Sequence, residues 1–172
     1  YMLAHDGKLW VFSYPYAWMS VYAPQAPWQG GRAPGSNPWQ CLSLDNQQNR
    51  FHQACIGPDG LIYTTTTSVY GVRGGALSRI HPDTLEVQVI RIEEQNPWAV
   101  TADDRFVYCG TAMRDESDLP PLAEEAAILV WDTEQSAFTR EIRPVSGAAH
   151  YQFLYLGGNG GRGFNRLRYF SF

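Results

Sequence analysis

Residues 57–87 constrain the fold more strongly than any other part of the chain, because they read as short strands separated by tight turns. Pro58-Asp59-Gly60 has the composition of a turn, and the β-branched and aromatic residues after it favour a pleated strand. Apolar and polar residues then alternate, as expected of strands with two different faces. The predicted strands cover residues 61–67, 76–80 and 86–93, with residues 81–84 as the turn of a hairpin.

Weaker copies of this stretch lie on both sides of it. The acidic turn recurs at His5-Asp6-Gly7 and at Ala102-Asp103-Asp104, each time before a hydrophobic strand that contains an aromatic residue. The strand of residues 76–82 recurs at residues 17–24 and 127–133, with residues 166–172 as a candidate fourth copy. A spacing of roughly 40–55 residues is typical of β-propeller blades. The sequence therefore predicts an all-β repeat protein.

The chain resembles the bacterial β-propeller repeat superfamily, with its NHL-like, YVTN-like and kelch-like blades. The pattern is an Asp-Gly turn, a hydrophobic residue with Tyr, a Gly-Gly-x-Leu strand start and an Asp-Pro-x-Thr turn. It is carried here by Asp59-Gly60, Ile62-Tyr63, Gly74-Gly75-Ala76-Leu77 and Pro82-Asp83-Thr84. The resemblance covers nearly the whole chain and implies antiparallel four-stranded blades, but it implies no catalytic residues.

Four approximate repeats, residues 1–46, 47–95, 96–145 and 146–172, are expected within one domain. This gives about three full blades plus a fragment, whereas propellers close with about four to eight blades. The first repeat starts so close to its turn that a full innermost strand is not expected. Three arrangements remain open: the chain is part of a longer propeller, two copies associate, or the ends pair into a compact ring. The first is favoured.

Composition narrows the class of protein. Of the 172 residues, 44% are hydrophobic and 14% aromatic, and the formal net charge is −4. This balance argues against nucleic-acid binding, which needs a basic surface. No apolar run is long enough to cross a membrane and the first residues do not resemble a signal peptide, so we expect a soluble domain whose location stays open.

Neither a metal nor another cofactor is predicted. Cys41, Cys55 and Cys109 lack metal-ligand spacing and are expected to be small apolar strand residues, with one disulfide as the alternative in an exported protein. The acidic loop at 113–125 is expected to be a solvated insertion, and a cation site is its alternative. The glycine run at 157–163 lacks the helix that a phosphate loop requires.

Candidate functional residues lie where innermost strands and their loops would line a propeller channel. His52, His150 and Tyr151 fall on two predicted innermost strands, and Tyr70 and Arg73 lie in the loop before residue 76. Together they could bind an anionic substrate and exchange a proton with it. Each histidine has a structural alternative, as a packed or hydrogen-bonded strand residue.

Four further residues are candidates for ligand binding. Arg50 and Arg162 would contact an anion, and Trp28 and Trp39, in or beside the long loop at 25–38, would stack on a sugar. The first hypothesis is a noncatalytic ligand-binding or protein-interaction module whose ligand is a small molecule or carbohydrate. The alternative, by analogy with propeller enzymes, is a polysaccharide lyase or hydrolase fragment acting on an acidic sugar. Convergence of His52, His150 and Arg73 would favour the enzyme.

Overall fold

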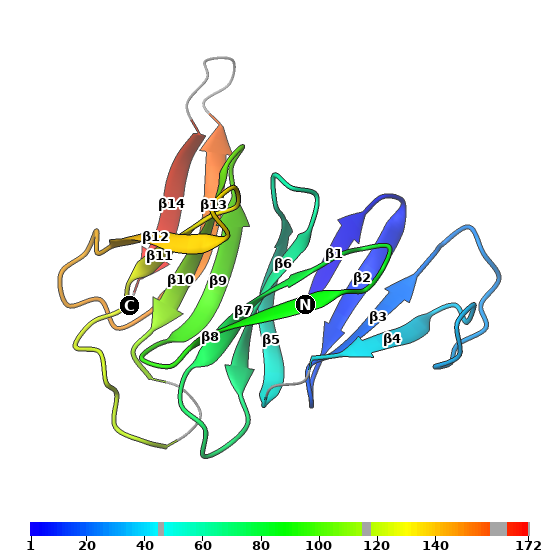
Figure 1. Ribbon diagram of the computed structural model, residues 1–172, viewed down its shortest axis with the longest axis horizontal. Coiled ribbons are helices and arrows are strands. Elements are labelled where there is room, and N and C mark those ends of the chain that lie inside the picture. Colours follow the sequence, from blue (N-terminus) through cyan, green and yellow to red (C-terminus); the bar gives the residue numbers. More distant parts are fainter. Residues whose placement is uncertain (45–46, 115–117, 159–164, 172) are drawn as a thin grey trace.

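The computed structural model describes residues 1–44, 47–114, 118–158 and 165–171. Within these ranges, all regular secondary structure is β-strand, arranged as three four-stranded sheets and one two-stranded sheet (Figure 1). In each sheet the strands follow chain order and neighbouring strands are antiparallel. The predicted all-β fold with propeller-like blades is therefore confirmed.

The strand bounds are as follows. The first sheet contains β1 (Met2–His5), β2 (Lys8–Ser13), β3 (Trp18–Tyr22) and β4 (Trp39–Ser43). The second contains β5 (Gln48–Ile56), β6 (Ile62–Ser68), β7 (Gly75–Ile80) and β8 (Val87–Ile92). The third contains β9 (Asn96–Ala102), β10 (Phe106–Ala112), β11 (Ile128–Asp132) and β12 (Ala137–Ile142). The fourth contains β13 (Tyr151–Gly158) and β14 (Asn165–Ser171).

Two details differ from the sequence-based expectations. The first sheet does have an innermost strand, since all four residues of β1 pair with β2, from Met2 opposite Val11 to His5 opposite Lys8. The last strand, expected as a copy of a third strand, instead pairs directly with β13 and so occupies the second position of its sheet. Strand composition is similar in the two positions, and pairing distinguishes them.

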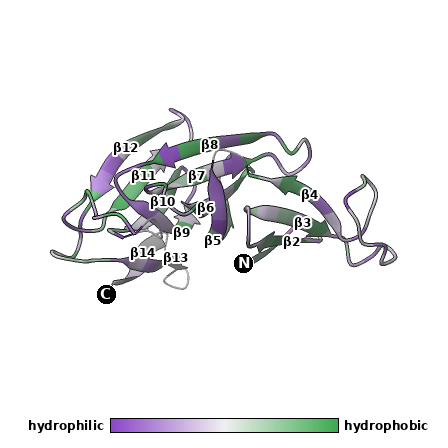
Figure 2. Ribbon diagram, turned by 90° about the horizontal axis from the view of Figure 1, so that it is seen from below, coloured by the Kyte–Doolittle hydropathy of each residue, from purple (hydrophilic) through white to green (hydrophobic). Residues whose placement is uncertain are grey.

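The sheets are arranged as a fan in which each buries an apolar face against the next (Figures 1 and 2). Trp10, Phe12, Met19 and Phe51 fill the first interface; Tyr63, Leu77, Val100 and Trp131 fill the second; Ala99, Ile128, Tyr151 and Leu154 fill the third. The first strands converge, with β9 in contact with both β5 and β13. Within the described part of the chain, the sheets do not close into a ring.

The repeated aspartates hold the turns between the first and second strands. In the second sheet, Asp59 accepts a 3.2 Å hydrogen bond from the Leu61 amide and a 2.8 Å bond from the Tyr63 hydroxyl. In the third, Asp103 accepts a 2.7 Å bond from the Tyr108 hydroxyl. Burial and then the bond to Asp103 raise the pKa of Tyr108 to about 12. The recurrence of Asp and Tyr is thus explained by turn structure.

Side chains of the second sheet also bind the neighbouring sheets. The four threonines of residues 64–67 are buried, and Thr65 donates to the Trp98 carbonyl over 2.9 Å. The Gln53 amide accepts a 3.1 Å hydrogen bond from Val100 N and donates a 3.5 Å bond to the Leu154 carbonyl. Gln53 therefore connects β5, β9 and β13. Buried polar groups are costly without partners, so this pairing fixes the sheets relative to one another.

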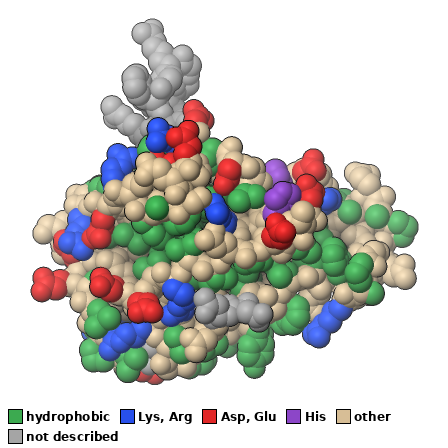
Figure 3. Space-filling view, in the orientation of Figure 1, with side chains coloured by type: hydrophobic (Ala, Val, Ile, Leu, Met, Phe, Trp, Pro, Cys, Tyr) green, Lys and Arg blue, Asp and Glu red, His purple; other side chains and the backbone are tan. Residues whose placement is uncertain are grey.

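Polar surface surrounds these interfaces. Figure 3 shows acidic and basic side chains interspersed over one face of the molecule. Among the described residues, no helix is both long and apolar enough to cross a bilayer.

Candidate functional site

Two predicted residues, His52 and His150, lie on either side of one tryptophan. The His52 ring stacks on Trp98 with 3.7 Å between ring centroids and 19° between planes. His150 meets the same indole edge-on, at 4.7 Å and 79°. The three residues come from β5, β9 and the segment just before β13, which are adjacent because β9 packs between the other two strands. The arrangement is an aromatic cluster at the convergence of the first strands.

The cluster is electrically neutral at ordinary pH. Burial, and then the nearby Arg50 and His150 side chains, lower the pKa of His52 to about 3. Burial also lowers the pKa of His150. The Nε2 atoms of both rings are buried and find no hydrogen-bond partner among the described residues. Buried polar atoms normally have partners, so these two nitrogens are exceptions to the usual pattern.

A hollow of about 320 Å³ adjoins the cluster. Trp98, Ala149 and His150 line it together with residues 112–114, which are the end of β10 and the two residues after it. A β-bridge between Ala112 and His150, and a 3.0 Å hydrogen bond from Met113 N to the Ala149 carbonyl, fix the two sides. Arg114 forms no ion pair with any residue that the structure describes. The hollow is thus mainly apolar, with one guanidinium and one imidazole.

Arg73 and Tyr70 belong to a different part of the surface. The Arg73 side chain donates to the Pro120 carbonyl and lines a separate hollow that also contains Arg91 and Leu119. Tyr70 is exposed in the same loop. Neither residue lines the hollow beside His150.

Tyr151 has a structural position. Its side chain is fully buried, its hydroxyl accepts a 3.3 Å hydrogen bond from Val145 N, and its ring meets Tyr169 edge-on. Arg50 lies over the Tyr14 ring, with its guanidinium carbon 4.8 Å from the centroid. Arg162 lies outside the described residues. Of the five proposed catalytic residues, the structure brings together His52 and His150 around Trp98.

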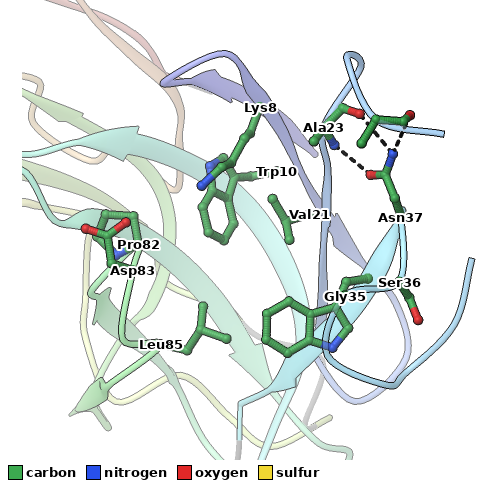
Figure 4. A pocket seen from close by; sticks show the side chains of 12 residues that line it. Lys8, Trp10, Val21, Ala23, Gly35, Ser36, Asn37, Pro82, Asp83 and Leu85 are labelled. Carbon is green, nitrogen blue, oxygen red and sulfur yellow. Dashed lines mark hydrogen bonds between the residues drawn. The ribbon is translucent and has the colours of Figure 1, made fainter. Parts of the chain in front are cut away.

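The two tryptophans proposed for sugar stacking differ. Trp28 is 74% exposed and leans against Tyr22, with 5.6 Å between ring centroids. Trp39 lines a second hollow, of about 340 Å³, between the first sheet and the β7–β8 turn of the second sheet (Figure 4). Lys8, Trp10 and Asp83 also line it. We call this hollow the intersheet groove.

Sequence reasoning missed Trp98 and Arg114 near the histidines, and Lys8 and Asp83 in the intersheet groove. Trp98 lies on a segment predicted as an innermost strand, like the segments of His52 and His150, so its position in the repeat could have placed it beside them. Arg114 follows β10 directly and is the one basic residue of an otherwise acidic loop. Lys8 begins β2 and Asp83 lies in a turn, and a charged residue at either place gives no sign of a partner.

The cysteines and the acidic loop give no sign of chemistry. All three cysteines lie in strands, as predicted, and are free thiols in the structure. Burial raises the pKa of Cys41 to about 11 and that of Cys55 to about 12, so both remain protonated and poorly nucleophilic. Across the described ranges, no group of three or more His, Cys, Asp or Glu residues has metal-binding geometry. Asp115 and Glu116, part of the loop considered for a cation, lie outside those ranges.

No protein-family model matches the chain, and no curated protein matches it. A functional proposal therefore depends on the geometry of the two hollows.

Proposed function

We propose that the protein is a noncatalytic ligand-binding module that holds a small organic anion in the hollow between Trp98, His150 and Arg114. The observation that carries the proposal is that Trp98, His150 and Arg114 line one hollow, with the His150 ring edge-on to Trp98. Ligand sites are mostly apolar hollows with a few convergent polar groups, and this one has that composition.

The chemistry of each wall indicates what would bind. Arg114 offers a planar set of donors that matches a carboxylate. His150, held neutral by its lowered pKa, offers a hydrogen bond without a charge. The Trp98 ring and the flexible Met113 side chain provide apolar contact for a ring or short chain. A compact carboxylate with an apolar body, or an acidic sugar, fits these features.

The enzyme hypothesis has less support. A general base works best with a pKa near the operating pH, whereas the pKa of His52 is about 3. Arg73, the expected partner of the substrate carboxylate, lines a different hollow. Tyr151, one of the residues expected to exchange a proton, is buried and hydrogen-bonded to Val145. Binding without catalysis needs none of these three roles.

Calorimetric titration of the protein with benzoate, indole-3-acetate and D-galacturonate tests the proposal. We expect saturable binding of at least one of these anions, and at least tenfold weaker binding by the Arg114→Gln variant. Arg73→Gln is the matched control, since this arginine lines another hollow, and it should bind like the wild type. Absence of saturable binding by all three anions would contradict the proposal. So would an increase in unsaturated-uronate absorbance when the protein is mixed with polygalacturonate.

We also propose that the sheets are blades of a propeller of the bacterial repeat superfamily, completed by further blades of a longer chain or by association with a second copy. The end sheets expose apolar residues on their first strands, namely Met2 on β1 and Phe153 on β13. The internal first strand β9 is instead covered on both sides, by β5 and β13. A second copy would cover the end faces as the internal sheets cover one another, and would protect exposed apolar surface.

A further inference from the structure

The intersheet groove lies away from the histidine cluster, at the end of the sheets that carries the β1–β2 and β7–β8 turns. Figure 4 shows Lys8, Trp10 and Val21 on one wall and Pro82, Asp83 and Leu85 on the facing wall. Trp39 and the loop at 25–38 form its third side. Its volume of about 340 Å³ lies within the ~300–1,000 Å³ range of small-ligand sites.

The loop wall is fixed by one side chain. Asn37 is buried, and its Oδ1 atom accepts a 2.8 Å hydrogen bond from Ala23 N. Its Nδ2 atom donates to the carbonyls of Ala23 and Ala26, at 2.9 and 3.0 Å. These bonds join the start of the loop to its end, so the wall is formed before any ligand arrives. Such preorganisation reduces the entropic cost of binding.

The Trp39 indole is held by its edge. Its Nε1 atom donates a 3.1 Å hydrogen bond to the Arg32 carbonyl. Arg32 is in turn held by a 2.7 Å bond from its Nε atom to Gln40 and by its position over the Trp18 ring, 5.0 Å from the centroid. Because the nitrogen is already paired, the indole contributes flat apolar surface to the groove.

Trp10 departs from the repeat at this place. It follows the turn aspartate Asp6 by four residues, as Tyr63 follows Asp59, but where Tyr63 donates to its aspartate, the Trp10 Nε1 atom is buried without a partner. The Trp10 side chain is only 2% exposed and lines the groove. Turn structure thus explains the tyrosine, whereas packing in the interface between the first two sheets explains the tryptophan.

Two opposite charges face the groove from different sheets. Lys8 projects from the start of β2 and Asp83 from the β7–β8 turn (Figure 4). Neither forms an ion pair in the described part of the chain. An ammonium group supplies donors and a carboxylate supplies acceptors. A ligand rich in hydroxyl groups can satisfy both, since each hydroxyl donates and accepts.

We propose that the intersheet groove binds a short neutral saccharide. The flat apolar surface of Trp39 matches the C–H face of a pyranose ring, and Lys8 and Asp83 match its hydroxyl groups. The two opposite charges cancel, so the groove offers no net attraction to an acidic or an amino sugar. This site is separate from the anion hollow beside His150 and is proposed to take an uncharged ligand.

Titration of the protein with cellobiose, maltose and N,N′-diacetylchitobiose, followed by tryptophan fluorescence and by ligand-observed NMR, tests this proposal. We expect saturable binding of at least one disaccharide. Asp83→Asn keeps the shape of its turn residue and should weaken that binding at least tenfold, as should Trp39→Ala. Trp28→Ala is the matched control, because Trp28 is exposed and lies outside the groove, and it should bind like the wild type.

Circular dichroism establishes that each variant is folded before it is titrated. Absence of saturable binding by all three sugars would overturn the proposal, and so would unchanged affinity in both Asp83→Asn and Trp39→Ala. Arg114→Gln, which tests the anion hollow, should leave disaccharide binding unchanged. Loss of sugar binding in that variant would place the sugar beside His150 and overturn the assignment to the groove.

Discussion

The Tyr63 hydroxyl donates a 2.8 Å hydrogen bond to Oδ2 of Asp59, four residues before it, and Tyr108 makes the same kind of bond to Asp103. Both tyrosines face an interface between sheets, while both aspartates hold a turn. The bond therefore couples the shape of a turn to the packing of a sheet, which accounts for a repeat that preserves these two residue types together.

Removing this bond should destabilise the second sheet. Tyr63→Phe keeps the buried ring but leaves Oδ2 of Asp59 without its hydroxyl donor, so we expect the free energy of unfolding to fall by about 1–3 kcal/mol. Urea denaturation measures the change. Tyr22→Phe is the control, because the structure shows no hydrogen bond from this hydroxyl to a described residue, and a shift of equal size in the control would contradict the interpretation.

Gln53 should contribute more to the stability of the fold than a single polar side chain normally does. Gln53→Leu removes the acceptor of Val100 N and the donor to Leu154 O, which leaves a buried amide unpaired between sheets. We expect a loss of about 1–3 kcal/mol in the free energy of unfolding. The exposed substitution Gln25→Leu should change it by less than about 0.5 kcal/mol. Equal stability of Gln53→Leu and wild type would contradict the bridging role.

Acid should weaken the protein through His52. Its pKa is about 3 in the folded state, below the usual value of about 6.5 expected on unfolding. The unfolded state therefore binds a proton at His52 that the folded state does not bind. The free energy of unfolding falls as the pH drops from about 6.5 towards 3. This residue alone should remove about 2 kcal/mol between pH 7 and pH 5.

The comparison of variants isolates the effect of His52. Denaturation of His52→Gln at the two pH values should show a smaller loss than the wild type. Thr65→Val, which removes a hydrogen bond to Trp98 without removing a titratable group, should be less stable yet keep the wild-type pH dependence. An unchanged pH dependence in His52→Gln would show that His52 is protonated normally in the folded protein.

The exposed ends of the fan should drive self-association. We expect sedimentation velocity to show dimers that increase with protein concentration, because Met2 and Phe153 are 63% and 54% exposed on first strands. A Met2→Ser/Phe153→Ser double variant should shift the equilibrium to monomer. Leu122→Ser, which replaces an exposed apolar residue in a loop, should not. A wild-type protein that stays monomeric at every concentration would contradict the proposed second copy.

Much of the fold could be predicted from sequence because its signals are local. Turn residues such as Pro58, Asp59 and Gly60, followed by β-branched strands, determine where each hairpin begins. The order of pairing at the end of the chain could not be predicted. Strand composition alone does not distinguish a second strand from a third, and β14 was assigned to the wrong position for that reason.

The candidate sites depend on contacts between residues distant in sequence. His52, Trp98 and His150 become neighbours only when three first strands converge, so the sequence indicated the two histidines but not the tryptophan between them. The intersheet groove likewise joins Lys8 of one sheet to Asp83 of the next. Neither residue breaks the pattern of its own hairpin, and only the packing of the two sheets brings them together.

The meander order of the sheets determines how the chain can gain or lose a whole sheet. Each sheet is built from consecutive residues and buries its face against the sheet that follows, so the array grows in one dimension. Duplication or deletion of one complete sheet would recreate the same kind of interface at the new junction. The histidine cluster spans three successive sheets, whereas the intersheet groove needs only two. A length change in evolution would therefore disrupt the former more readily than the latter.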